Sequence, residues 1–243
     1  MRILFVVVLV ACSAKPAPQP APPVAPIAPR SDSAEGAAHD ADHHADHKGH
    51  MHHRFDDADR WAKVFDDPAR DAWQQPDKVI GLLDLTPNMV VADIGAGTGY
   101  FTMRLARQVP RGQVIATDIE ADMIRYLDER AKREAITNVR ALVTPPDDPQ
   151  LGTRAIDRIL VVDVWHHLDD RTAYARKLAS ALKPGGSIAI VDFKLDASRG
   201  PPKQHRLAPD AIIGDLRAAG LHAELAPLEL PDQYVVIARS PGH

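Results

Sequence analysis

The feature that most constrains the fold is a set of three closely spaced glycines in the sequence VVADIGAGTGYF, residues 90–101. Gly95, Gly97 and Gly99 follow an apolar, β-rich run and precede a stretch whose apolar residues recur at helical spacing. Glycine allows the backbone to turn sharply and lets a ligand approach the main chain closely. The sequence therefore predicts a strand, a tight loop that binds a ligand, and a helix, in that order.

Short apolar runs alternate with amphipathic stretches through much of the chain. Strands are expected at residues 89–94, 113–118, 138–143, 157–164 and 187–193, and helices at residues 101–109, 121–135, 171–182 and 209–220. Two more apolar runs, 221–230 and 233–240, have no helix between them and are expected to form an antiparallel pair at the sheet's edge. This order predicts an α/β fold whose seven-stranded sheet is mostly parallel, with an antiparallel last strand and helices on both faces.

The spacing of the three glycines separates two kinds of loop. A dinucleotide-binding fingerprint reads G-x-G-x-x-G, whereas here the third glycine comes one residue early and Tyr100 takes its place, which disfavours a nicotinamide oxidoreductase. The pattern D-x-G-x-G-x-G at residues 93–99 resembles motif I of the class I S-adenosylmethionine-dependent methyltransferases. Asp118 at the end of the second strand, LKPGG at 182–186 and VWHHLDD at 164–170 are also typical of that family.

The resemblance covers most of residues 76–239 and is strongest to the broad group that includes the ubiquinone and menaquinone C-methyltransferases. It implies the Rossmann-like class I methyltransferase fold and the transfer of a methyl group from S-adenosylmethionine to a small-molecule acceptor. Ligands of such parallel sheets bind beyond the carboxyl ends of the strands. The net charge is -4 at pH 7, so a nucleic-acid partner is not expected.

The resemblance also implies which residues hold the cofactor. They lie in the glycine loop and at the following strand ends: Asp93, Gly95, Ala96, Gly97, Gly99, Asp118, Ile119, Asp147, Val162 and Asp163. By this resemblance the loop residues line the methionine part of the cofactor, and Asp93 helps to orient it. Asp118 is expected to bind the ribose hydroxyls, and Ile119 to pack on the adenine.

Two further roles are implied for the later strand ends. The adenine amino group is expected to meet Asp147, with Asp148 as the alternative, because VTPPDDPQL at 143–151 departs from the family's commoner GD pattern. Val162 and Asp163 end the fourth strand and are expected beside the sulfonium.

Three histidines are candidates for acid–base work or for binding the acceptor. His166 and His167 follow the fourth strand, and His205 lies in the segment GPPKQHRL after the fifth. Histidine is the side chain best suited to gain or lose a proton near neutral pH, but each of the three also fits a packing, capping or surface role. Asp163 and Asp192 end neighbouring strands and offer an alternative, a Mg²⁺ site, for which no third ligand is evident.

The first twelve residues, MRILFVVVLVAC, resemble a secretory signal that ends in the lipobox of bacterial lipoproteins. Cys12 is the only cysteine, and its place at the end of the lipobox predicts a lipid anchor. A single cysteine cannot form an internal disulfide. The predicted domain has no cysteine, which argues against the arsenite-methylating relatives, because these hold arsenic with thiolates. We expect export and lipid anchoring at the bacterial cell envelope, facing the periplasm, or a cytoplasmic location if the signal is not used. No apolar run reaches the ~20 residues of a membrane-spanning helix, so membrane contact is expected only through Cys12.

Two polar segments separate this signal from the predicted domain. Residues 13–38 are rich in proline and alanine and are expected to form a disordered, semi-rigid tether. Residues 39–53 are expected to be a disordered, histidine-rich segment, and its candidates for loose binding of a divalent metal such as Zn²⁺, Ni²⁺ or Cu²⁺ are His43, His44, His47, His50, His52 and His53. The alternative for this segment is a solvated, pH-sensitive linker.

The methyltransferase domain is expected to span residues 54–243, and its first part, 54–75, to be a helical lid over the acceptor or a packing segment. S-adenosylmethionine is made in the cytoplasm, whereas the start of the chain resembles an export signal. A second function is therefore an exported metal-binding lipoprotein whose methyltransferase fold lacks activity. The identity of the acceptor and the oligomeric state do not follow from the sequence.

Overall fold

The computed structural model of the protein describes residues 57–240. The predicted signal and lipobox at 1–12, the tether at 13–38 and the histidine-rich segment at 39–53, with its six candidate metal ligands, lie outside the described residues. Among residues 57–240, no helix is both long enough and apolar enough to cross a membrane.

Seven strands form one sheet in the order β3-β2-β1-β4-β5-β7-β6. Their bounds are β1 Val90–Ile94, β2 Gln113–Asp118, β3 Val139–Val143, β4 Ile156–Val162, β5 Leu182–Phe193, β6 His222–Leu225 and β7 Gln233–Arg239. The first five strands are parallel to one another, whereas β7 is antiparallel to both β5 and the edge strand β6. The predicted mostly parallel sheet, with an antiparallel last strand and a final antiparallel pair at its edge, is confirmed.

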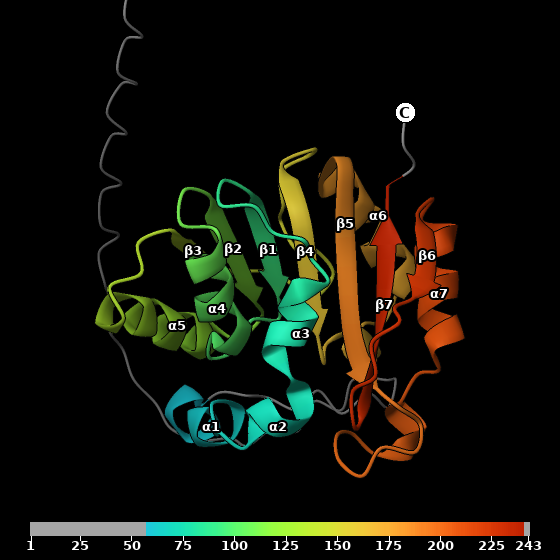
Figure 1. The fold of residues 1–243 in the computed structure, drawn as a ribbon, viewed down its shortest axis with the longest axis horizontal. Helices are drawn as coiled ribbons and strands as arrows, with labels where there is room; N and C mark the ends of the chain where they lie inside the picture. The colour runs from blue at the N-terminus through green and yellow to red at the C-terminus, as the bar shows by residue number, and fades with distance from the viewer. Residues whose placement is uncertain (1–56, 241–243) are drawn as a thin grey trace, which may run out of the picture. The chain divides into compact units, whose positions relative to one another are not determined.

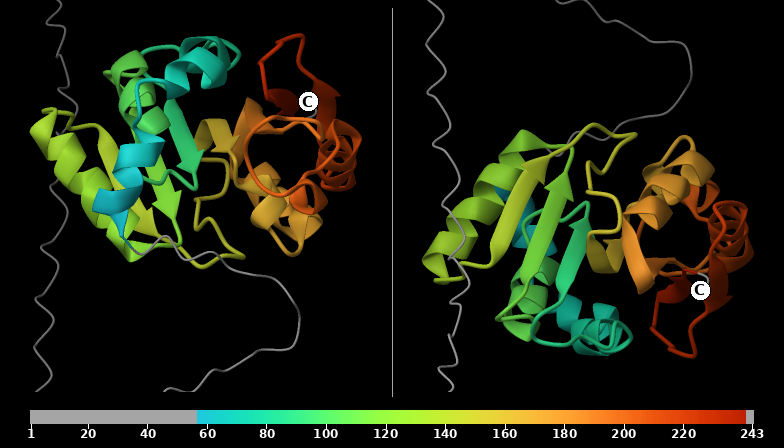
Figure 2. Two further views of the ribbon diagram at one scale, coloured as in Figure 1. Left: turned by 90° about the horizontal axis from the view of Figure 1, so that it is seen from below. Right: turned by 90° about the horizontal axis from the view of Figure 1, so that it is seen from above.

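Helices cover both faces of the sheet, as the sequence predicts (Figure 1, Figure 2). Their bounds are α1 Ala58–Phe65, α2 Arg70–Gln74, α3 Pro76–Gly81, α4 Tyr100–Gln108, α5 Ala121–Arg133, α6 Arg171–Ala181 and α7 Pro209–Ala218, with short 3-10 helices η1 Trp165–His167 and η2 Lys203–His205. Buried side chains of α3, α4 and α5 form the core on one face, and those of α6 and α7 form the core on the other.

The helix starts follow from local chemistry. Asp57 accepts a hydrogen bond from the Arg60 N–H (3.0 Å) at the start of α1, and Asp170 does the same for the Ala173 N–H (2.9 Å) at the start of α6. Such side chains satisfy N–H groups that have no partner within the helix. Prolines open α3 and α7, where the absence of an N–H carries no penalty.

The fifth strand begins earlier than the sequence predicts. The segment LKPGG reads as a turn ahead of a strand that starts at Ser187, but β5 begins at Leu182. Its pairing with β4 jumps from Leu182 to Ser187, so residues 183–186 bulge out of the ladder. Lys183 Nζ lies 2.7 Å from Asp157 Oδ2 and ties this bulge to β4. The expected strand start at residue 187 was therefore wrong, because the segment remains attached to the sheet.

Substitutions at two glycines outside the predicted site can test how tightly the fold is packed. Gly112→Ala is expected to lower the free energy of unfolding by about 3 kcal/mol, because the added Cβ would lie 1.9 Å from the carbonyl oxygen of Met89. Gly214→Ala is the matched control in the interior of α7, where nothing lies within 4 Å of the added Cβ. Alanine favours a helix over glycine, so this variant should gain about 0.5–1 kcal/mol. Urea denaturation of the purified chain measures both changes, and equal stability of the two variants would contradict the packing described at Gly112.

Candidate cofactor and acceptor site

The carboxyl ends of the parallel strands meet at the edge of the sheet that the sequence predicts for the site. In Figure 1 the arrowheads of β1, β2, β4 and β5 point toward α1 and α2. Parallel pairing sets Ile94 beside Thr117 and Val161, and sets Val162 beside Val191. The loops after these four strands are therefore neighbours, and Val162 lies at their base with 8% of its surface exposed.

The glycine loop after β1 has the backbone shape that its sequence predicts. Gly95, Gly97 and Gly99 have φ angles of 66°, 53° and 87°, in the left-handed region that favours glycine. A Cβ on Gly95 would lie 2.2 Å from Cγ2 of Val164, in the segment after β4. The loop is thus packed directly against the end of β4, and position 95 has no room for a side chain.

Two contacts join the glycine loop to β2. The Asp118 carboxylate accepts a hydrogen bond from the Gly97 N–H (2.8 Å), and the Thr117 carbonyl oxygen accepts one from the Ala96 N–H (2.9 Å). The second Asp118 oxygen accepts from the Glu120 N–H (3.0 Å). Burial raises the pKa of Asp118, and these N–H donors oppose the rise. The carboxylate that is predicted to bind the ribose therefore also holds the loop in shape.

Ile119 and Val143 expose large apolar side chains next to Asp118. Ile119 is 50% exposed and Val143 is 49% exposed. Val143 pairs with Asp118 across the two neighbouring strands. Exposed apolar surface beside a polar anchor fits a planar ring such as adenine. Val143 is a candidate contact that sequence reasoning missed, because nothing in a short apolar strand indicates which of its side chains stays uncovered.

The candidate adenine-binding residues Asp147 and Asp148 lie in the helix-free connection between β3 and β4. Lys177 of α6 donates to the backbone oxygen of Asp147 (2.6 Å) and pairs with the Asp148 carboxylate (3.2 Å). The Asp147 carboxylate lies 3.9 Å from Lys177 Nζ, and its side chain is 84% exposed. Burial raises the pKa of Tyr174, and the charges of Asp148, Asp118 and Asp147 add to that rise. The charges of all three carboxylates therefore act on the same buried hydroxyl group.

Asp93 lies beneath the glycine loop, at the end of β1. It is 3% exposed and accepts a hydrogen bond from the Thr102 hydroxyl (2.6 Å) in α4. Burial raises the pKa of Asp93 to about 6, and the Thr102 hydrogen bond opposes the rise. Asp93 therefore links β1 to α4 across the loop, a position that fits its predicted role in orienting the cofactor.

Asp163, at the end of β4, starts a chain of polar contacts that sequence reasoning missed. Its carboxylate accepts a hydrogen bond from Gln233 Nε2 (2.5 Å), and Gln233 Oε1 accepts one from Gln74 Nε2 (2.6 Å). Both glutamines are fully buried. Burial raises the pKa of Asp163 to about 7, the positive charge of Arg70 opposes the rise, and the negative charge of Asp192 adds to it. Asp163 therefore changes its charge near neutral pH.

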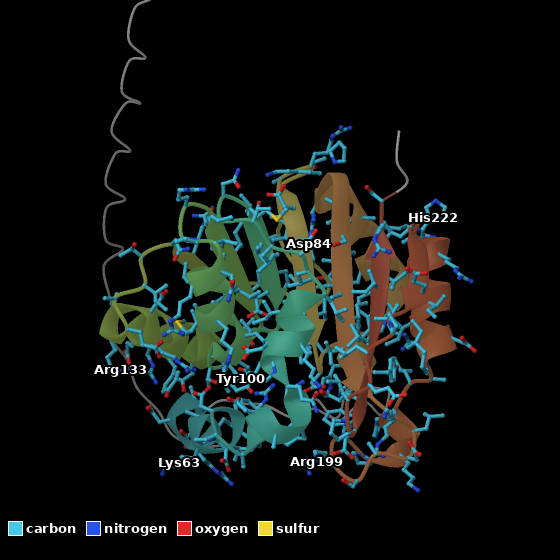
Figure 3. The ribbon with its side chains drawn as sticks, viewed as in Figure 1. Lys63, Asp84, Tyr100, Arg133, Arg199 and His222 are labelled. Atoms are coloured by element: carbon cyan, nitrogen blue, oxygen red, sulfur yellow. The ribbon has the colours of Figure 1, made fainter. Side chains whose placement is uncertain are left out.

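Arg70 of α2 brings a positive charge to these carboxylates. Its Nε donates to Gln74 Oε1 (2.9 Å), and a terminal nitrogen donates to the Phe65 carbonyl oxygen (2.8 Å). The guanidinium carbons of Arg70 and Arg104 lie 4.1 Å and 4.0 Å from the centre of the Tyr100 ring. Figure 3 shows Tyr100 at this edge of the sheet, near α1 and α2. No signal in the sequence distinguishes Arg70 from an exposed helical arginine.

The three candidate acid–base histidines have different surroundings. The His166 side chain is 3% exposed, and its Nδ1 lies 2.9 Å from Oδ1 of the fully buried Asp192. His167 is exposed, with its ring centre 4.2 Å from that of His166. His205 is exposed in η2, on the loop between β5 and α7. The structure therefore brings His166 together with Asp192 and Asp163, whose charges interact.

The alternative metal site at Asp163 and Asp192 gains no third ligand. In the described part of the chain, no group of three or more His, Cys, Asp or Glu side chains is arranged to hold a metal ion. The carboxylate of Asp163 is instead bonded to Gln233, and that of Asp192 to His166 and the Phe193 N–H.

α1 and the turn after it border the glycine loop. The Phe65 ring lies 3.7 Å from the position of a Cβ on Gly97. Asp66 accepts hydrogen bonds from the Thr98 hydroxyl (3.1 Å) and from Arg130 (2.7 Å). This part of the predicted N-terminal segment therefore packs on the domain and lies against the loop at the same time.

Comparison with known proteins points to the same part of the chain. A family model described as a methyltransferase domain matches residues 91–186. An uncharacterized methyltransferase of Mycobacterium bovis is 31% identical over 103 residues, which are 42% of this chain and 50% of that protein. A trans-aconitate 2-methyltransferase of Rhodopseudomonas palustris is 33% identical over 102 residues, which are 41% of this chain and 37% of that protein. The chain thus spans half or less of the length of these curated relatives.

The likeness to a solved structure extends further along the chain. A S-adenosylmethionine-dependent methyltransferase from Aquifex aeolicus has a TM-score of 0.69 and 26% sequence identity, and the match covers 76% of this chain and 99% of that one. The shared part is therefore a whole domain and not the glycine loop alone. The sheet order, the match over residues 91–186 and these relatives agree that the chain carries a class I S-adenosylmethionine-dependent methyltransferase domain.

Proposed function

We propose that the protein transfers the methyl group of S-adenosylmethionine to a small-molecule acceptor. The observation that carries this proposal is the left-handed glycine loop at the end of β1, held by the Asp118 carboxylate at the end of β2. The methyltransferase-domain match begins in β1 and includes this loop, which supports the proposal.

The residues at the strand ends fit the chemical groups of S-adenosylmethionine. The glycine loop leaves its main chain accessible to the methionine part, and Asp118 offers a carboxylate to the ribose hydroxyls. Ile119 and Val143, each about half exposed, offer an apolar surface to the adenine. Arg70, whose positive charge acts on Asp163, offers a partner for the methionine carboxylate.

S-adenosylmethionine supplies an electrophilic methyl group on a positively charged sulfur. The contribution of the chain is mainly position, because an in-line displacement depends on holding two reactants in the right geometry. Asp163 places a carboxyl group with a pKa of about 7 at the strand end where the sulfonium is expected. Phe65 lies against the glycine loop from α1 and helps to exclude water there.

Two similarities support a small organic acceptor. One relative is named as a trans-aconitate 2-methyltransferase, and LKPGG and VWHHLDD resemble segments of the ubiquinone and menaquinone C-methyltransferase group. The rival function, an exported lipoprotein with an inactive fold, receives no support from relatives that are named as methyltransferases. The export and the lipid anchor are a separate proposal, based on the sequence LVAC at residues 9–12 and the proline-rich stretch after it.

Asp118→Asn is expected to weaken the binding of S-adenosylmethionine by roughly 10- to 100-fold, because a hydrogen bond to a charged group contributes about 1.5–3 kcal/mol. Asp128→Asn is the matched control, since Asp128 is an exposed aspartate on α5, and it should keep the wild-type affinity. Isothermal titration calorimetry measures the dissociation constants. Equal affinity of the wild type and both variants would contradict the proposed ribose contact.

The affinity for S-adenosylmethionine is expected to rise as the pH increases from about 5 to about 8. Burial raises the pKa of Asp93 to about 6 and that of Asp163 to about 7, so both carboxyls lose protons over this interval and become negative near the sulfonium. Asp163→Asn removes the later ionisation and should flatten the upper part of the rise. S-adenosylhomocysteine, whose sulfur is neutral, should show a smaller rise. Calorimetry at several pH values tests this, and identical pH profiles for wild type and Asp163→Asn would count against it.

Cys12 is expected to carry the proposed lipid anchor. Bacterial cells that express the full chain and take up a palmitate analogue should label the wild-type protein but not Cys12→Ser, because the thiol is the acylated group. Fractionation should place the wild type with membranes. An unlabelled wild-type chain in the cytoplasmic fraction would refute the anchor and leave the proposed methyl transfer unaffected.

A further inference from the structure

His166, which follows β4, and Asp192, at the end of β5, form a buried pair. Nδ1 of His166 lies 2.9 Å from Oδ1 of Asp192. The neighbouring Trp165 is fully buried and donates from Nε1 to Asp215 of α7 (3.2 Å), which also accepts from Arg171 Nε (2.9 Å). These contacts anchor η1, so His166 is held in one orientation at the end of β4.

The segment that leads into His166 packs against the glycine loop. Val164, two residues before His166, is the residue that a Cβ on Gly95 would strike at 2.2 Å. The charges of His166 and Asp192 act on Asp163, which follows β4, and Asp192 also acts on Tyr234 of β7. The ring of His167 in η1 lies beside that of His166, and Arg70 of α2 acts on Asp163. The pair therefore belongs to the edge of the sheet where the reacting groups are expected.

The hydrogen bonds of Asp192 determine which nitrogen of His166 is basic. Oδ1 accepts from the Phe193 N–H (2.7 Å) and faces Nδ1 of His166, whereas Oδ2 is buried and has no partner among residues 57–240. A carboxylate can only accept, so the neutral ring of His166 carries its proton on Nδ1 and its lone pair on Nε2. Within the described residues no group bonds to Nε2, which leaves this nitrogen available to a ligand.

We infer that His166 takes a proton from the acceptor, that Asp192 is the residue that positions it, and that the acceptor is methylated on a weakly acidic hydroxyl group such as a phenol. This inference rests on the proposed methyl transfer. A carboxylate acceptor is already an anion, and a neutral amine attacks with its own lone pair, so neither needs a base before attack. A phenol does need one.

The atoms and charges of this step balance. The O–H bond of the acceptor breaks, its electron pair forms the bond to the methyl carbon, and the bond from that carbon to sulfur breaks with its pair left on sulfur. The proton passes to Nε2 of His166. The imidazolium that forms is stabilised by the Asp192 carboxylate, 2.9 Å from Nδ1.

The first test needs neither cofactor nor acceptor. In the full chain labelled with ¹⁵N at histidine, the His166 signals are identified by their loss in His166→Gln. At a pH where the ring is neutral, they should show Nδ1 protonated and Nε2 unprotonated. Asp192→Asn keeps the shape but removes the charge, and it should shift the Nδ1 proton signal. A wild-type His166 that carries its proton on Nε2 would overturn the positioning role of Asp192.

The second test measures transfer of a tritiated methyl group from S-adenosylmethionine to a panel of phenols and carboxylic acids, with cofactor binding measured separately by calorimetry. His166→Gln and Asp192→Asn should bind the cofactor as the wild type does but methylate phenols about 100-fold more slowly. The loss should shrink with a nitrophenol that is already ionised at the assay pH, whereas a merely structural role would slow both acceptors equally. His222→Gln is the matched control, because His222 is exposed and lies away from α1 and α2 in Figure 3.

The outcomes separate this inference from the proposed function. Three results would overturn the inference if calorimetry still shows cofactor binding. They are unchanged turnover of phenols in His166→Gln, methyl transfer to carboxylic acids alone, and methyl transfer to no phenol. If the wild-type chain does not bind S-adenosylmethionine, the proposed function fails instead. The tautomer of His166 then still decides whether Asp192 orients the ring.

Discussion

The parallel pairing of β1 with β2 on one side and β4 on the other is the constraint on which the site depends. Because β1 lies between these strands, the loop after it is flanked by the loops after β2 and β4. The Asp118 carboxylate can therefore reach the Gly97 N–H, and Val164 packs so closely on Gly95 that no side chain fits there. The segment after β4 then continues directly into His166. A shift of one strand would disturb the glycine loop and the position of His166 together.

Several carboxyl groups lie close together at this edge of the sheet, and their negative charges repel one another. Burial raises the pKa of Asp93 to about 6 and that of Asp163 to about 7, because the ionised form loses its hydration. Arg70 offsets part of this charge while its guanidinium lies against the Tyr100 ring. Such shifted pKa values concentrate at functional sites, where groups must titrate near the working pH. A bound sulfonium cation would relieve the repulsion, which gives a physical reason for placing these carboxyls together.

The parts of the fold that could be predicted are those whose signals lie within a few consecutive residues. The glycine loop, the helix that opens at Pro209 and the final antiparallel pair are examples. The start of β5 was predicted wrongly, because LKPGG has the composition of a turn and joins the sheet only as a bulge tied by Lys183 to β4. The contact between Gln74 and Gln233 escaped prediction because it joins residues 159 positions apart. No local pattern reports such a pairing.

The sequence by itself determined the alternation of strands and helices, the shape of the glycine loop and the place of Asp118 at the end of the second strand. These follow from hydrophobic periodicity and from the backbone freedom of glycine, which are properties of neighbouring residues. Only the tertiary structure decided that His166 faces Asp192, and that α2 brings Arg70 to the end of β4. Those contacts depend on which strand ends become neighbours and on which polar groups lose their water, and both are set when the sheet and its helices pack.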